Sequence, residues 1–522
     1  VYPCGIPITG ILGMGLWACW DVSFSAAYDV GKNWLRALSK KPVDSSVTEC
    51  RNQEKTIMDP TTDQEVQLLA ISPLDGRYAD KTLQLKSIFS EFGLIKYRVM
   101  IEVKWLVALS NCTEIIELPS FSKTELEYLE NMINQFSLTD AISVKNIEHV
   151  TNHDIKAVEY FLKDKLTSKE EIGDVTQFIH FACTSEDINN LAYALMLKEG
   201  REQIILPMLR QIRDQLEKLA REYSHTPMLA RTHGQAASPT TMGKELANFL
   251  SRLKVASNRL ENIPIYGKFN GAVGNFNAHA IAYPDINWPE LTQIFVEELG
   301  LSYQRMTTQI EPHDGIAEYC HGLRHINTIL LDLNRDLWTY ISLNYFRQKV
   351  VPDEIGSSTM PHKVNPIDFE NSEGNIGIAN SILSHLVEKL PISRLQRDLT
   401  DSTTLRNLGV AFGHSLVAYV SILKGLDKLE LNTAVLASEL DQSWEILSEA
   451  IQTVMRRHAI EESYEQLKEL TRGKEHITPE LLKNFIEQLP IPDESRDALL
   501  RLSPKNYLGH AIDLTLDSLE DK

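Results

Sequence analysis

Proline is spaced so widely along this 522-residue chain that most of the chain can form long, uninterrupted helices. Residues 74–118, 120–206, 313–351 and 392–478 contain no proline. Proline inside a helix removes a backbone hydrogen bond and collides with the preceding turn, so its absence over such stretches permits unusually long helices. The sequence therefore predicts an all-α, mainly helical fold.

Apolar side chains recur at helical spacing in two segments. Between residues 205 and 223 they form one apolar face, made of Ile205, Met208, Leu209, Ile212, Leu216, Leu219 and Tyr223. Between Leu323 and Tyr345 they spread further around the helix, through Leu330, Leu333, Leu337, Ile341 and Phe346. A helix that is apolar on several sides needs several packing partners, so we expect a central bundle completed by other copies of the chain. No convincing run of alternating strand residues is present, although short hairpins are compatible with the sequence.

The first 57 residues differ from the rest, because they begin with valine and hold three of the six cysteines. Residues 6–20 are apolar, but this stretch is short for a membrane span, is interrupted by Pro7, and lacks the basic region that precedes a signal peptide core. We expect residues 1–57 to be an appended or upstream-translated extension outside the fold, with Met58 as the natural start. A genuine leader segment is the alternative.

Charge and cysteine content narrow the class of protein. The formal net charge of −19 disfavours binding to a phosphate backbone and suits a soluble cytoplasmic protein. Beyond the extension, Cys112, Cys183 and Cys320 are odd in number and widely spaced, which argues against a disulfide framework and fits a reducing compartment. An anionic substrate would need a local cationic pocket in so acidic a chain.

The segment Gly356–Pro366, G-S-S-T-M-P-H-K-V-N-P, concentrates several kinds of polar group in one loop. Its glycine permits unusual backbone angles, its serines and threonine offer hydroxyls, Lys363 supplies positive charge, and Asn365 can donate and accept. Its two prolines exclude a continuous helix. Such a loop suits a carboxylate that is held while a neighbouring carbon loses its proton. An ordinary turn between helices is the alternative for any short part of the string.

Three further polar clusters stand beside this loop. Arg231–Gln235, R-T-H-G-Q, precedes a helical pattern, so we expect His233 near a helix start. Thr151–Asp154, T-N-H-D, should open a helix with one of its first two residues as the N-cap. Thr184–Asp187, T-S-E-D, has the same capping pattern, with N–H groups available to an anion. Each cluster alone is compatible with a simple helix cap, whereas together they supply many convergent polar groups.

Two histidine pairs, His149 with His153 and His321 with His325, have a spacing that can place two metal ligands on one helix face. Neither pair carries the glutamate of H-E-x-x-H, and no third ligand is evident, so we expect hydrogen-bonded histidines. A Walker loop, a G-x-G-x-x-G after a strand and a G-x-S-x-G elbow are missing as well. The sequence predicts no metal, no cofactor, and neither nucleic acid nor a membrane as a partner.

The loop resembles the signature G-S-S-x-M-P-x-K-x-N of the fumarase/aspartase superfamily, whose members release fumarate from succinyl-type substrates. Six accompanying segments resemble the bacterial-type adenylosuccinate lyase family. They are S-P-L-D-G-R-Y (72–78), T-N-H-D (151–154), T-S-E-D (184–187), R-T-H-G-Q (231–235), T-T-Q-I-E-P-H-D (307–314) and Q-R-D-L-T-D-S-T-T-L-R-N (396–407). The likeness runs from about residue 70 to the C-terminus.

The resemblance implies a three-domain fumarase/aspartase-like fold, with an N-terminal helical domain at 58–173, a central long-helix bundle carrying the signature loop at 174–426, and a C-terminal helical domain at 427–522. It also implies a homotetramer whose active sites combine segments of three subunits. The implied reaction is β-elimination of fumarate from adenylosuccinate to give AMP, and from the related succinylocarboxamide ribotide SAICAR to give AICAR.

The family pattern implies catalytic roles for Ser357, His233 and Glu370. Ser357 resembles the base that removes the C–H proton. Because a serine hydroxyl is a weak base, the loop N–H groups and Lys363 must favour its alkoxide. His233 resembles the general acid that protonates the leaving nitrogen. Glu370 matches the carboxylate that orients this histidine, although an acid in the first turn of a helix is the alternative.

Binding roles follow from the same matching. The succinyl carboxylates are assigned to Thr184, Ser185, Gln309, Ser358, Lys363 and Asn365. The purine and ribose are assigned to Asn152, His153, Asp154 and Asn371. The phosphate and neighbouring polar contacts are assigned to Arg77, Tyr78, Arg397, Ser402 and Arg406. These arginines would supply the local positive charge that the acidic chain lacks elsewhere. His153 could assist proton transfer or position the base.

Two alternatives stay open. Argininosuccinate lyase, or another fumarate-releasing relative, shares the loop and the fold but needs no phosphate pocket, so Arg77, Arg397 and Arg406 argue against it. A helical scaffold that has lost catalysis is the other alternative. The presence of every matched chemical position argues against a scaffold.

Overall fold

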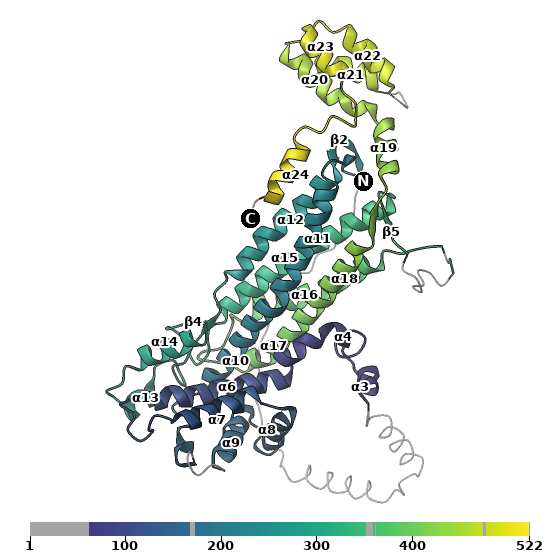
Figure 1. The fold of residues 1–522 in the computed structure, drawn as a ribbon. Helices are drawn as coiled ribbons and strands as arrows, with labels where there is room; N and C mark the ends of the chain where they lie inside the picture. Colours follow the sequence, from purple (N-terminus) through teal and green to yellow (C-terminus); the bar gives the residue numbers. More distant parts are fainter. Residues whose placement is uncertain (1–61, 168–172, 351–358, 361, 473–476, 521–522) are drawn as a thin grey trace, which may run out of the picture. The chain divides into compact units, whose positions relative to one another are not determined.

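A computed structural model describes residues 62–167, 173–350, 359–360, 362–472 and 477–520, and the predicted extension 1–57 lies outside them. The structure is mainly helical, with 67% helix, which confirms the predicted class (Figure 1). The chain divides into two compact units, Val1–Ala70 and Ile71–Lys522. Of the first unit the structure describes residues 62–70, which include α3 (Asp63–Leu69), opened by a capping box between Thr62 and Glu65.

Within the described part of the second unit, five long helices close into a ring. They are α11 (Leu206–Glu222), α12 (Met242–Glu261), α15 (Asp314–Ser342), α16 (Ile367–Lys389) and α18 (Leu408–Asp427). Helix α11 packs on α12, α12 on α15, α15 on α16, α16 on α18, and α18 back on α11. The predicted central bundle is therefore present within a single chain (Figure 1).

Helix α15 is apolar on the sides that meet its neighbours. The side chains that are 0% exposed include Leu323, Leu330, Leu333 and Leu337. The helix ends at Ser342, and Asn344 then takes a left-handed backbone with φ of 60°. Phe346 consequently lies in strand β5 (Phe346–Gln348), so the expectation that it continues the helical pattern is wrong.

The chain remains helical on both sides of Pro207. Helix α10 (Ser185–Gly200) continues through a π-helical turn, Arg201–Ile205, into α11. A wider turn next to proline accommodates the missing N–H and the bulk of the ring. The predicted apolar face is confirmed, because Leu209, Ile212, Leu216 and Leu219 are buried.

Two buried asparagines of α15 make polar contacts with neighbouring helices of the ring. Asn327 of α15 donates to Ser415 of α18 at 3.1 Å and accepts from the hydroxyl of Tyr419 at 2.6 Å. Asn334 of α15 donates to Ser372 of α16 at 2.9 Å. A polar group buried without a partner is costly, so these pairs favour one alignment of the helices along each other.

A group of helices N-terminal to the ring packs at one end of it, with α6 against α10. They are α4 (Ala79–Thr82), η1 (Leu83–Leu85), α5 (Lys86–Phe89), α6 (Glu91–Ser110), α7 (Lys123–Asn134), α8 (Leu138–Thr151), α9 (Asp154–Thr167) and η2 (Gly173–Phe178). Trp105 of α6 is fully buried, with its ring centroid 4.2 Å from that of Phe269. Two further helices, α13 (Asn277–Ala282) and α14 (Trp288–Glu298), lie between α12 and α15 in the sequence and are not part of the ring.

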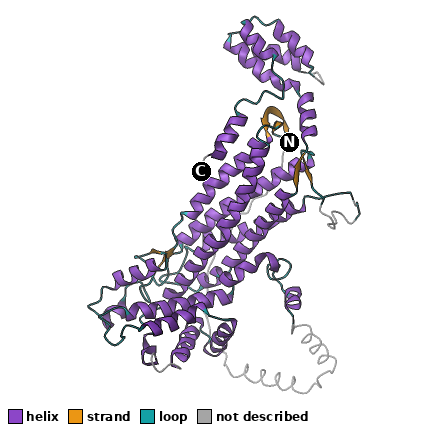
Figure 2. Ribbon diagram, in the orientation of Figure 1, coloured by secondary structure: helices purple, strands orange, loops and turns teal. Residues whose placement is uncertain are grey.

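Strands in the described residues form three two-stranded sheets (Figure 2). The antiparallel pairs are β1 (Pro227–Thr232) with β2 (Gln235–Thr241), and β5 with β6 (Leu429–Leu431). The parallel pair is β3 (Tyr266–Gly267) with β4 (Ser302–Tyr303). The short hairpin left open by the sequence is therefore present at β1–β2.

The C-terminal helices have an apolar core of their own, to which Leu229 of β1 contributes. The elements are α19 (Thr433–Gln442), η4 (Trp444–Leu447), α20 (Ser448–Arg457), α21 (Ser463–Thr471), α22 (Pro479–Glu487) and α23 (Asp493–Leu500). The last helix, α24 (Ala511–Glu520), returns to the ring, packs on α11 and α12, and adds Leu519 to the main core. The proposed domain boundaries after residues 173 and 426 stay predictions.

The segment Thr400–Asp427 is long and apolar enough, by length and composition alone, to cross a membrane. It comprises α17 (Thr400–Leu405) and α18, and its most apolar window is 72% buried in the protein. The hydropathy of this segment is explained by its place in the helix ring.

Replacement of Leu330 by alanine should lower the free energy of unfolding by about 2–5 kcal/mol, because it leaves a cavity where α15 meets its neighbours. The matched control is Leu514→Ala on α24, where the leucine is 55% exposed. Its effect should stay below about 1 kcal/mol. Chemical denaturation of both variants measures the difference, and equal effects would contradict the assigned core.

Candidate active site

The first residue of α9, Asp154, lies between two arginines of distant segments. Its Oδ2 is 2.7 Å from Nη2 of Arg98 in α6 and 3.6 Å from Nη2 of Arg406. Burial alone would raise the pKa of Asp154, but Arg98, the Ile155 N–H and Arg406 outweigh it and hold the pKa below its ordinary value. The carboxylate is therefore kept charged.

The turn before α9 differs from the prediction. Asn152 ends α8 as a left-handed C-cap with φ of 51°, and Nδ1 of His153 accepts the N–H of Lys156 at 3.2 Å. His153 thus caps α9, and the expectation that Thr151 or Asn152 would be the N-cap is wrong. Asparagine tolerates the left-handed backbone, which makes the tight link between the two helices possible. Asn152 and His153 are both exposed beside the Asp154 carboxylate.

Arg397 lies between two buried carboxylates. Its Nη2 is 2.8 Å from Oε1 of Glu186 in α10, and its Nε is 3.5 Å from Oδ2 of Asp401 in α17. The backbone N–H of Ser402 donates to the other oxygen of Asp401 at 2.6 Å. Arg397 and Ser402, which were assigned together from the sequence, are therefore joined through Asp401.

His313 is a buried histidine that faces this group. Its ring nitrogens are 3.5 Å from Glu311 Oε2 and 3.8 Å from Asp401 Oδ2, distances typical of an ion pair. Burial disfavours the protonated ring, but Asp401 and Glu311 outweigh it and raise the pKa of His313 to about 9. A charged His313 balances part of the negative charge around Arg397.

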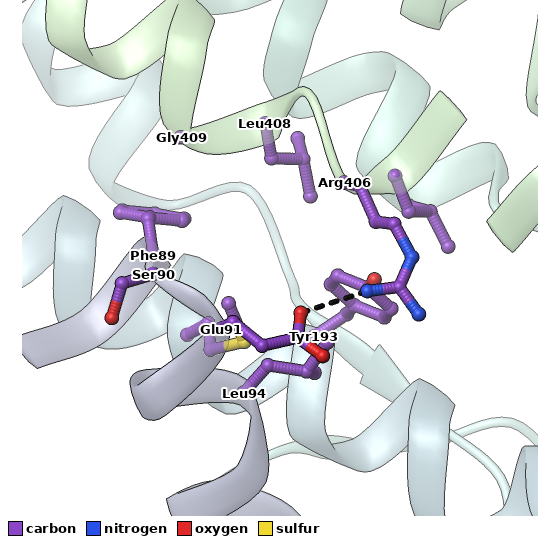
Figure 3. Close-up of a pocket in the computed structure, with 10 residues that line it drawn as sticks. Phe89, Ser90, Glu91, Leu94, Tyr193, Arg406, Leu408 and Gly409 are labelled. Atoms are coloured by element: carbon purple, nitrogen blue, oxygen red, sulfur yellow. Dashed lines mark hydrogen bonds and ion pairs between the residues drawn. The ribbon is translucent and has the colours of Figure 1, made fainter. Parts of the chain in front are cut away.

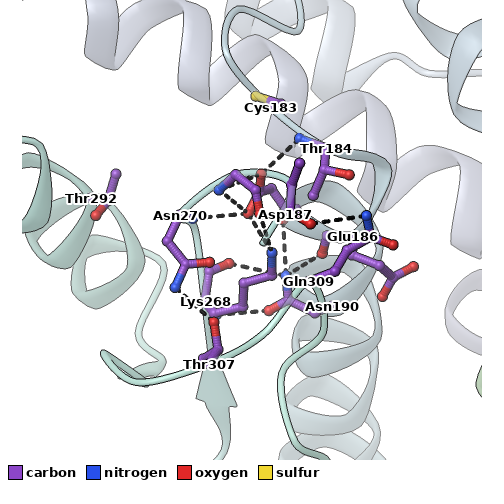
Figure 4. Close-up of polar contacts among 12 residues, drawn as sticks. Cys183, Thr184, Glu186, Asp187, Asn190, Lys268, Asn270, Thr292, Thr307 and Gln309 are labelled. Carbon is purple, nitrogen blue, oxygen red and sulfur yellow. Dashed lines mark hydrogen bonds and ion pairs between the residues drawn. The ribbon is translucent and has the colours of Figure 1, made fainter. Parts of the chain in front are cut away.

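The start of α10 is held by a fully buried ion pair (Figure 4). The N–H of Thr184 donates to Asp187 Oδ2 at 2.8 Å, which confirms the predicted capping at T-S-E-D. Asp187 Oδ1 accepts from Lys268 Nζ at 2.8 Å and from the N–H of Asn270 at 2.9 Å. Both charged side chains are 0% exposed, so the pair orders the segment after β3 without contacting solvent.

Gln309 lies beside this segment, and Figure 4 shows it in the same group as Thr184. Its Nε2 donates to the carbonyl of Ala272 at 3.0 Å. Thr184, Ser185 and Gln309 are all partly exposed. Three residues assigned to the succinyl carboxylates therefore lie around one ordered scaffold.

Tyr78 and Asn371 are brought into contact although they are 293 residues apart. The Tyr78 hydroxyl donates to Asn371 Oδ1 at 3.0 Å, and Asn371 Nδ2 donates to Ser421 of α18 at 2.7 Å. Arg77, on the same turn as Tyr78, is exposed. The S-P-L-D-G-R-Y segment is thereby attached near the start of α16.

Arg406 lines two neighbouring cavities, and Figure 3 shows the residues that line the smaller one. Nη1 of Arg406 is 2.8 Å from Glu91 Oε2. The smaller cavity, of about 90 Å³, is also lined by Tyr193 and Leu408. The larger cavity, of about 330 Å³, is lined by Ser72 as well. The first and last of the family-like segments therefore meet around one arginine.

His233 occupies the tip of the β1–β2 hairpin. His233 and Gly234 have φ of 53° and 75°, and Thr232 pairs with Gln235 across the turn. Two residues with positive φ match the tight turn that suits twisted strands. The expectation that His233 lies near a helix start is wrong, because β2 separates it from α12. The side chain is exposed at the tip.

The hairpin is attached to the C-terminal helices on both strands. The guanidinium of Arg231 pairs with Glu439 of α19, and its Nε donates to the Tyr345 hydroxyl at 3.3 Å. Tyr345 also donates to Glu439. On the other strand Ser238 donates to Glu449, which accepts from the Tyr507 hydroxyl at 3.1 Å. These contacts fix the strands that present His233.

The first turn of α16 carries Glu370, whose Oε1 accepts from Trp338 Nε1 at 3.1 Å. Within the described part of this single chain, Glu370 makes no hydrogen bond to His233, so their pairing stays a prediction. Lys363 is exposed and Asn365 is half-buried just before the helix. Ser357 and Ser358 lie outside the described residues.

Comparison with known protein families shows the family to which this chain belongs. The chain matches the family described as Lyase over residues 76–380 and the family described as Adenylosuccinate lyase C-terminal over residues 393–508. It is 55% identical over 447 residues to the adenylosuccinate lyase of Haemophilus influenzae, covering 86% of this chain and 98% of the relative. The chain belongs to the adenylosuccinate lyase family.

Other relatives and solved structures agree with this placement. The adenylosuccinate lyase of Escherichia coli K12 is 55% identical over 445 residues, covering 85% of this chain and 97% of the relative. A fumarate lyase from Mesorhizobium sp. BNC1 superposes with a TM-score of 0.67 at 20% identity, covering 85% of this chain and 98% of the neighbour. The 3-carboxy-cis,cis-muconate lactonizing enzyme of Pseudomonas putida superposes with a TM-score of 0.65 at 20% identity, covering 84% of this chain and 96% of the neighbour. At such identities the two structures support the fold alone.

Several residues that organise this adenylosuccinate lyase site were not singled out in the sequence. Arg98 lies in a long helix away from the quoted motifs, and Asn189 follows T-S-E-D by two residues in α10, so neither residue belonged to a motif that signalled its role. Glu186, His313 and Asp401 lie inside family-like segments but received no role. Buried charges inside motifs point to partners elsewhere, which is the signal that could have identified these three.

Among the described residues, no group of three or more His, Cys, Asp or Glu side chains is arranged to hold a metal ion. His153, of the first predicted histidine pair, accepts the N–H of Lys156.

Two histidines that are fully buried in the described residues, His313 and His279, should give opposite dependences of stability on pH. The pKa of His313 is raised above the ordinary 6.5 to about 9, so its contribution is present below pH 6.5 and lost as the pH rises through 9. Burial lowers the pKa of His279 to about 4, so stability is lost as the pH falls from 6.5 through 4. The His313 contribution is at most about 3 kcal/mol, since one pKa unit corresponds to about 1.4 kcal/mol.

Denaturation of wild type, His313→Gln and His279→Gln across this pH range measures both effects. The difference between the stabilities of wild type and His313→Gln should shrink as the pH rises from 6.5 through 9, because the buried imidazolium beside Glu311 and Asp401 loses its proton only near the upper end of this range. His279→Gln should instead reduce the acid sensitivity. A His313→Gln protein with the wild-type slope on the alkaline side would contradict the assigned charge.

Proposed function

We propose that the chain catalyses the elimination of fumarate from adenylosuccinate to give AMP, and from SAICAR to give AICAR, in the cytoplasm. The observation that carries this proposal is the 55% identity to adenylosuccinate lyases over 86% of the chain, together with the matching C-terminal family region. Arg406 beside Asp154 and Arg397 beside Glu186, next to segments assigned to binding, support a site for an anionic nucleotide.

The elimination needs a base, an acid and support for growing negative charge. The Ser357 alkoxide takes the proton from the carbon beside the succinyl carboxylate, and negative charge spreads onto that carboxylate. The electron pair then forms the double bond of fumarate as the carbon–nitrogen bond breaks. His233 gives its proton to the departing nitrogen, and Glu370 orients the imidazole.

The residues assigned to binding fall into groups according to the part of the substrate that they contact. Lys363, Asn365 and Ser358 stabilise the succinyl carboxylates from the signature loop, and Thr184, Ser185 and Gln309 do so from the α10 end. Fixed cations and N–H donors at a developing carboxylate charge lower the barrier without reorganising. Arg77, Tyr78, Arg397, Ser402 and Arg406 hold the phosphate, while Asn152, His153, Asp154 and Asn371 line the nucleoside.

A homotetramer would bring these groups together. The exposed His233 hairpin and the T-N-H-D turn lie on separate elements of one chain, and sites shared between subunits would join such elements. The exposed Trp338 and Ile378, 45% and 49% exposed on α15 and α16, offer apolar surface on the helix ring for association.

Argininosuccinate lyase activity is the alternative from the same superfamily. The match of residues 393–508 to the adenylosuccinate lyase C-terminal family favours the nucleotide substrate. A non-catalytic scaffold is disfavoured because His233, Glu370 and Lys363 are present in the chain and exposed in the structure.

Purified protein should release fumarate from adenylosuccinate with a matching ultraviolet change, and should not act on argininosuccinate. His233→Ala and Ser357→Ala should lower kcat by about 10²–10⁴-fold, because each removes a proton-transfer group. Ser357→Ala should still bind substrate, which calorimetry measures. Turnover of argininosuccinate alone would refute the assignment, and unchanged turnover in Ser357→Ala would remove it as the base.

Mixing inactive His233→Ala and Ser357→Ala proteins under conditions of subunit exchange should restore part of the activity. Restoration is expected because some mixed sites would combine an intact acid from one subunit with an intact base from another. The matched control mixes His233→Ala with itself. Mixed tetramers, demonstrated by mass, that stay inactive would contradict sites shared between subunits.

A further inference from the structure

Two of the three arginines assigned to the phosphate, Arg397 and Arg406, are oriented by carboxylates. Arg397 pairs with Glu186 at 2.8 Å, and Arg406 pairs with Glu91 at 2.8 Å and with Asp154 at 3.6 Å. A carboxylate that orients an arginine also cancels part of its positive charge. An arginine balanced in this way attracts a phosphate weakly unless another cation compensates the carboxylates.

A third arginine, Arg98 of α6, reaches both sets of contacts. Its Nη2 donates to Asp154 Oδ2 at 2.7 Å, and its Nε donates to Asn189 Oδ1 at 2.9 Å. Asn189 Nδ2 in turn donates to Glu186 Oε1 at 2.9 Å, the oxygen that pairs with Arg397. One continuous series of polar contacts therefore joins Asp154 to Arg397.

Arg98 cannot contact a ligand itself, because it is only 1% exposed. It is 0.9 Å closer to Asp154 than Arg406 is, at 2.7 Å against 3.6 Å, so the buried cation balances most of that carboxylate. The guanidinium of Arg406 keeps a side-chain exposure of 40%. Arg406 can therefore direct its charge toward solvent and a bound anion.

The amide of Asn189 gives the network a fixed direction. Its oxygen accepts from Arg98 and its nitrogen donates to Glu186, and a reversed amide would lose both bonds. Asn189 is 7% exposed and Glu186 is 2% exposed, so no solvent replaces a lost partner. The position of Arg98 thus determines where the Glu186 carboxylate, and with it Arg397, is held.

We propose that Arg98 is a positioning residue for nucleotide binding: it balances Asp154 and, through Asn189 and Glu186, holds Arg397, so that Arg397 and Arg406 act together on the phosphate. This inference rests on the proposed function, in which those two arginines hold the phosphate. Arg98 lies in α6, inside the region that matches the Lyase family but outside the short motif segments quoted from the sequence.

The test compares Arg98→Met with Arg201→Met in the full-length protein. Arg201 is a matched control, because it is 8% exposed and donates to the carbonyl of Ile263 at 2.6 Å, away from the network. Arg98→Met should weaken AMP binding, measured by calorimetry, by about tenfold or more, since a charge-assisted contact is lost. The KM for adenylosuccinate should rise in parallel, while kcat and the inhibition constant of fumarate change less than about threefold.

The outcomes separate this inference from the proposed function. Failure of the wild-type protein to bind AMP would refute the proposed function itself. AMP binding that is equal in wild type, Arg98→Met and Arg201→Met would refute only the role of Arg98. Equal weakening of AMP and fumarate would also refute it, because a general disturbance of the site affects both ligands.

Two further variants keep the test decisive if Arg98→Met does not fold. Arg98→Lys retains the charge but cannot reach Asp154 and Asn189 with one ammonium group, so its AMP affinity should be intermediate. Asn189→Leu leaves the charge of Arg98 and removes the link to Glu186, so AMP binding should again weaken. Wild-type AMP affinity in Asn189→Leu would overturn the proposed link to Arg397.

Discussion

The mutual burial of apolar faces around the ring of α11, α12, α15, α16 and α18 is the constraint on which the rest of the structure depends. A dry helix interface accepts a polar group only when a partner lies opposite, as Asn327 and Asn334 have in Ser415 and Ser372. Chemistry that needs charge and water is therefore confined to the helix ends and the loops between them. The residues assigned to catalysis and binding lie at such places, on the β1–β2 tip, before α9, before α10 and before α16.

The burial of the helix interfaces also explains why the carboxylates near the starts of α9 and α10 need cations beside them. At the start of α10, Glu186 and Asp187 are buried too deeply for water to screen them, and at the start of α9 the Asp154 side chain is 25% exposed. The buried cation Arg98 lies against Asp154, and the buried His313 lies 3.8 Å from Asp401, a carboxylate that also pairs with Arg397. The acidic chain can thereby present a local positive site, because the compensation takes place behind the arginines that face the ligand.

Helix length and core faces were predictable because both depend on local properties. Proline spacing and apolar periodicity indicated the long helices, and Leu330 and Leu216 are buried as expected. Backbone details at helix ends were less predictable. Phe346 does not continue the helical pattern, because the chain turns at Asn344. His153, and not Thr151 or Asn152, caps α9. His233 and Gly234 form the tip of a hairpin, although the helical pattern that follows them had predicted a helix start. In each case the chain changed direction at residues with positive φ: Asn344, Asn152, and the pair His233 and Gly234.

The sequence by itself determined the helical class, the family and the chemical groups available, because proline spacing, periodicity and motifs are written in consecutive residues. Only the tertiary structure decided which charges meet. Arg98 and Asp154 are 56 residues apart, and Tyr78 and Asn371 are 293 apart, yet both pairs are in hydrogen-bond contact. No local pattern encodes such a pairing, since it depends on how the helices pack around their shared core and on the cost of leaving a buried charge alone.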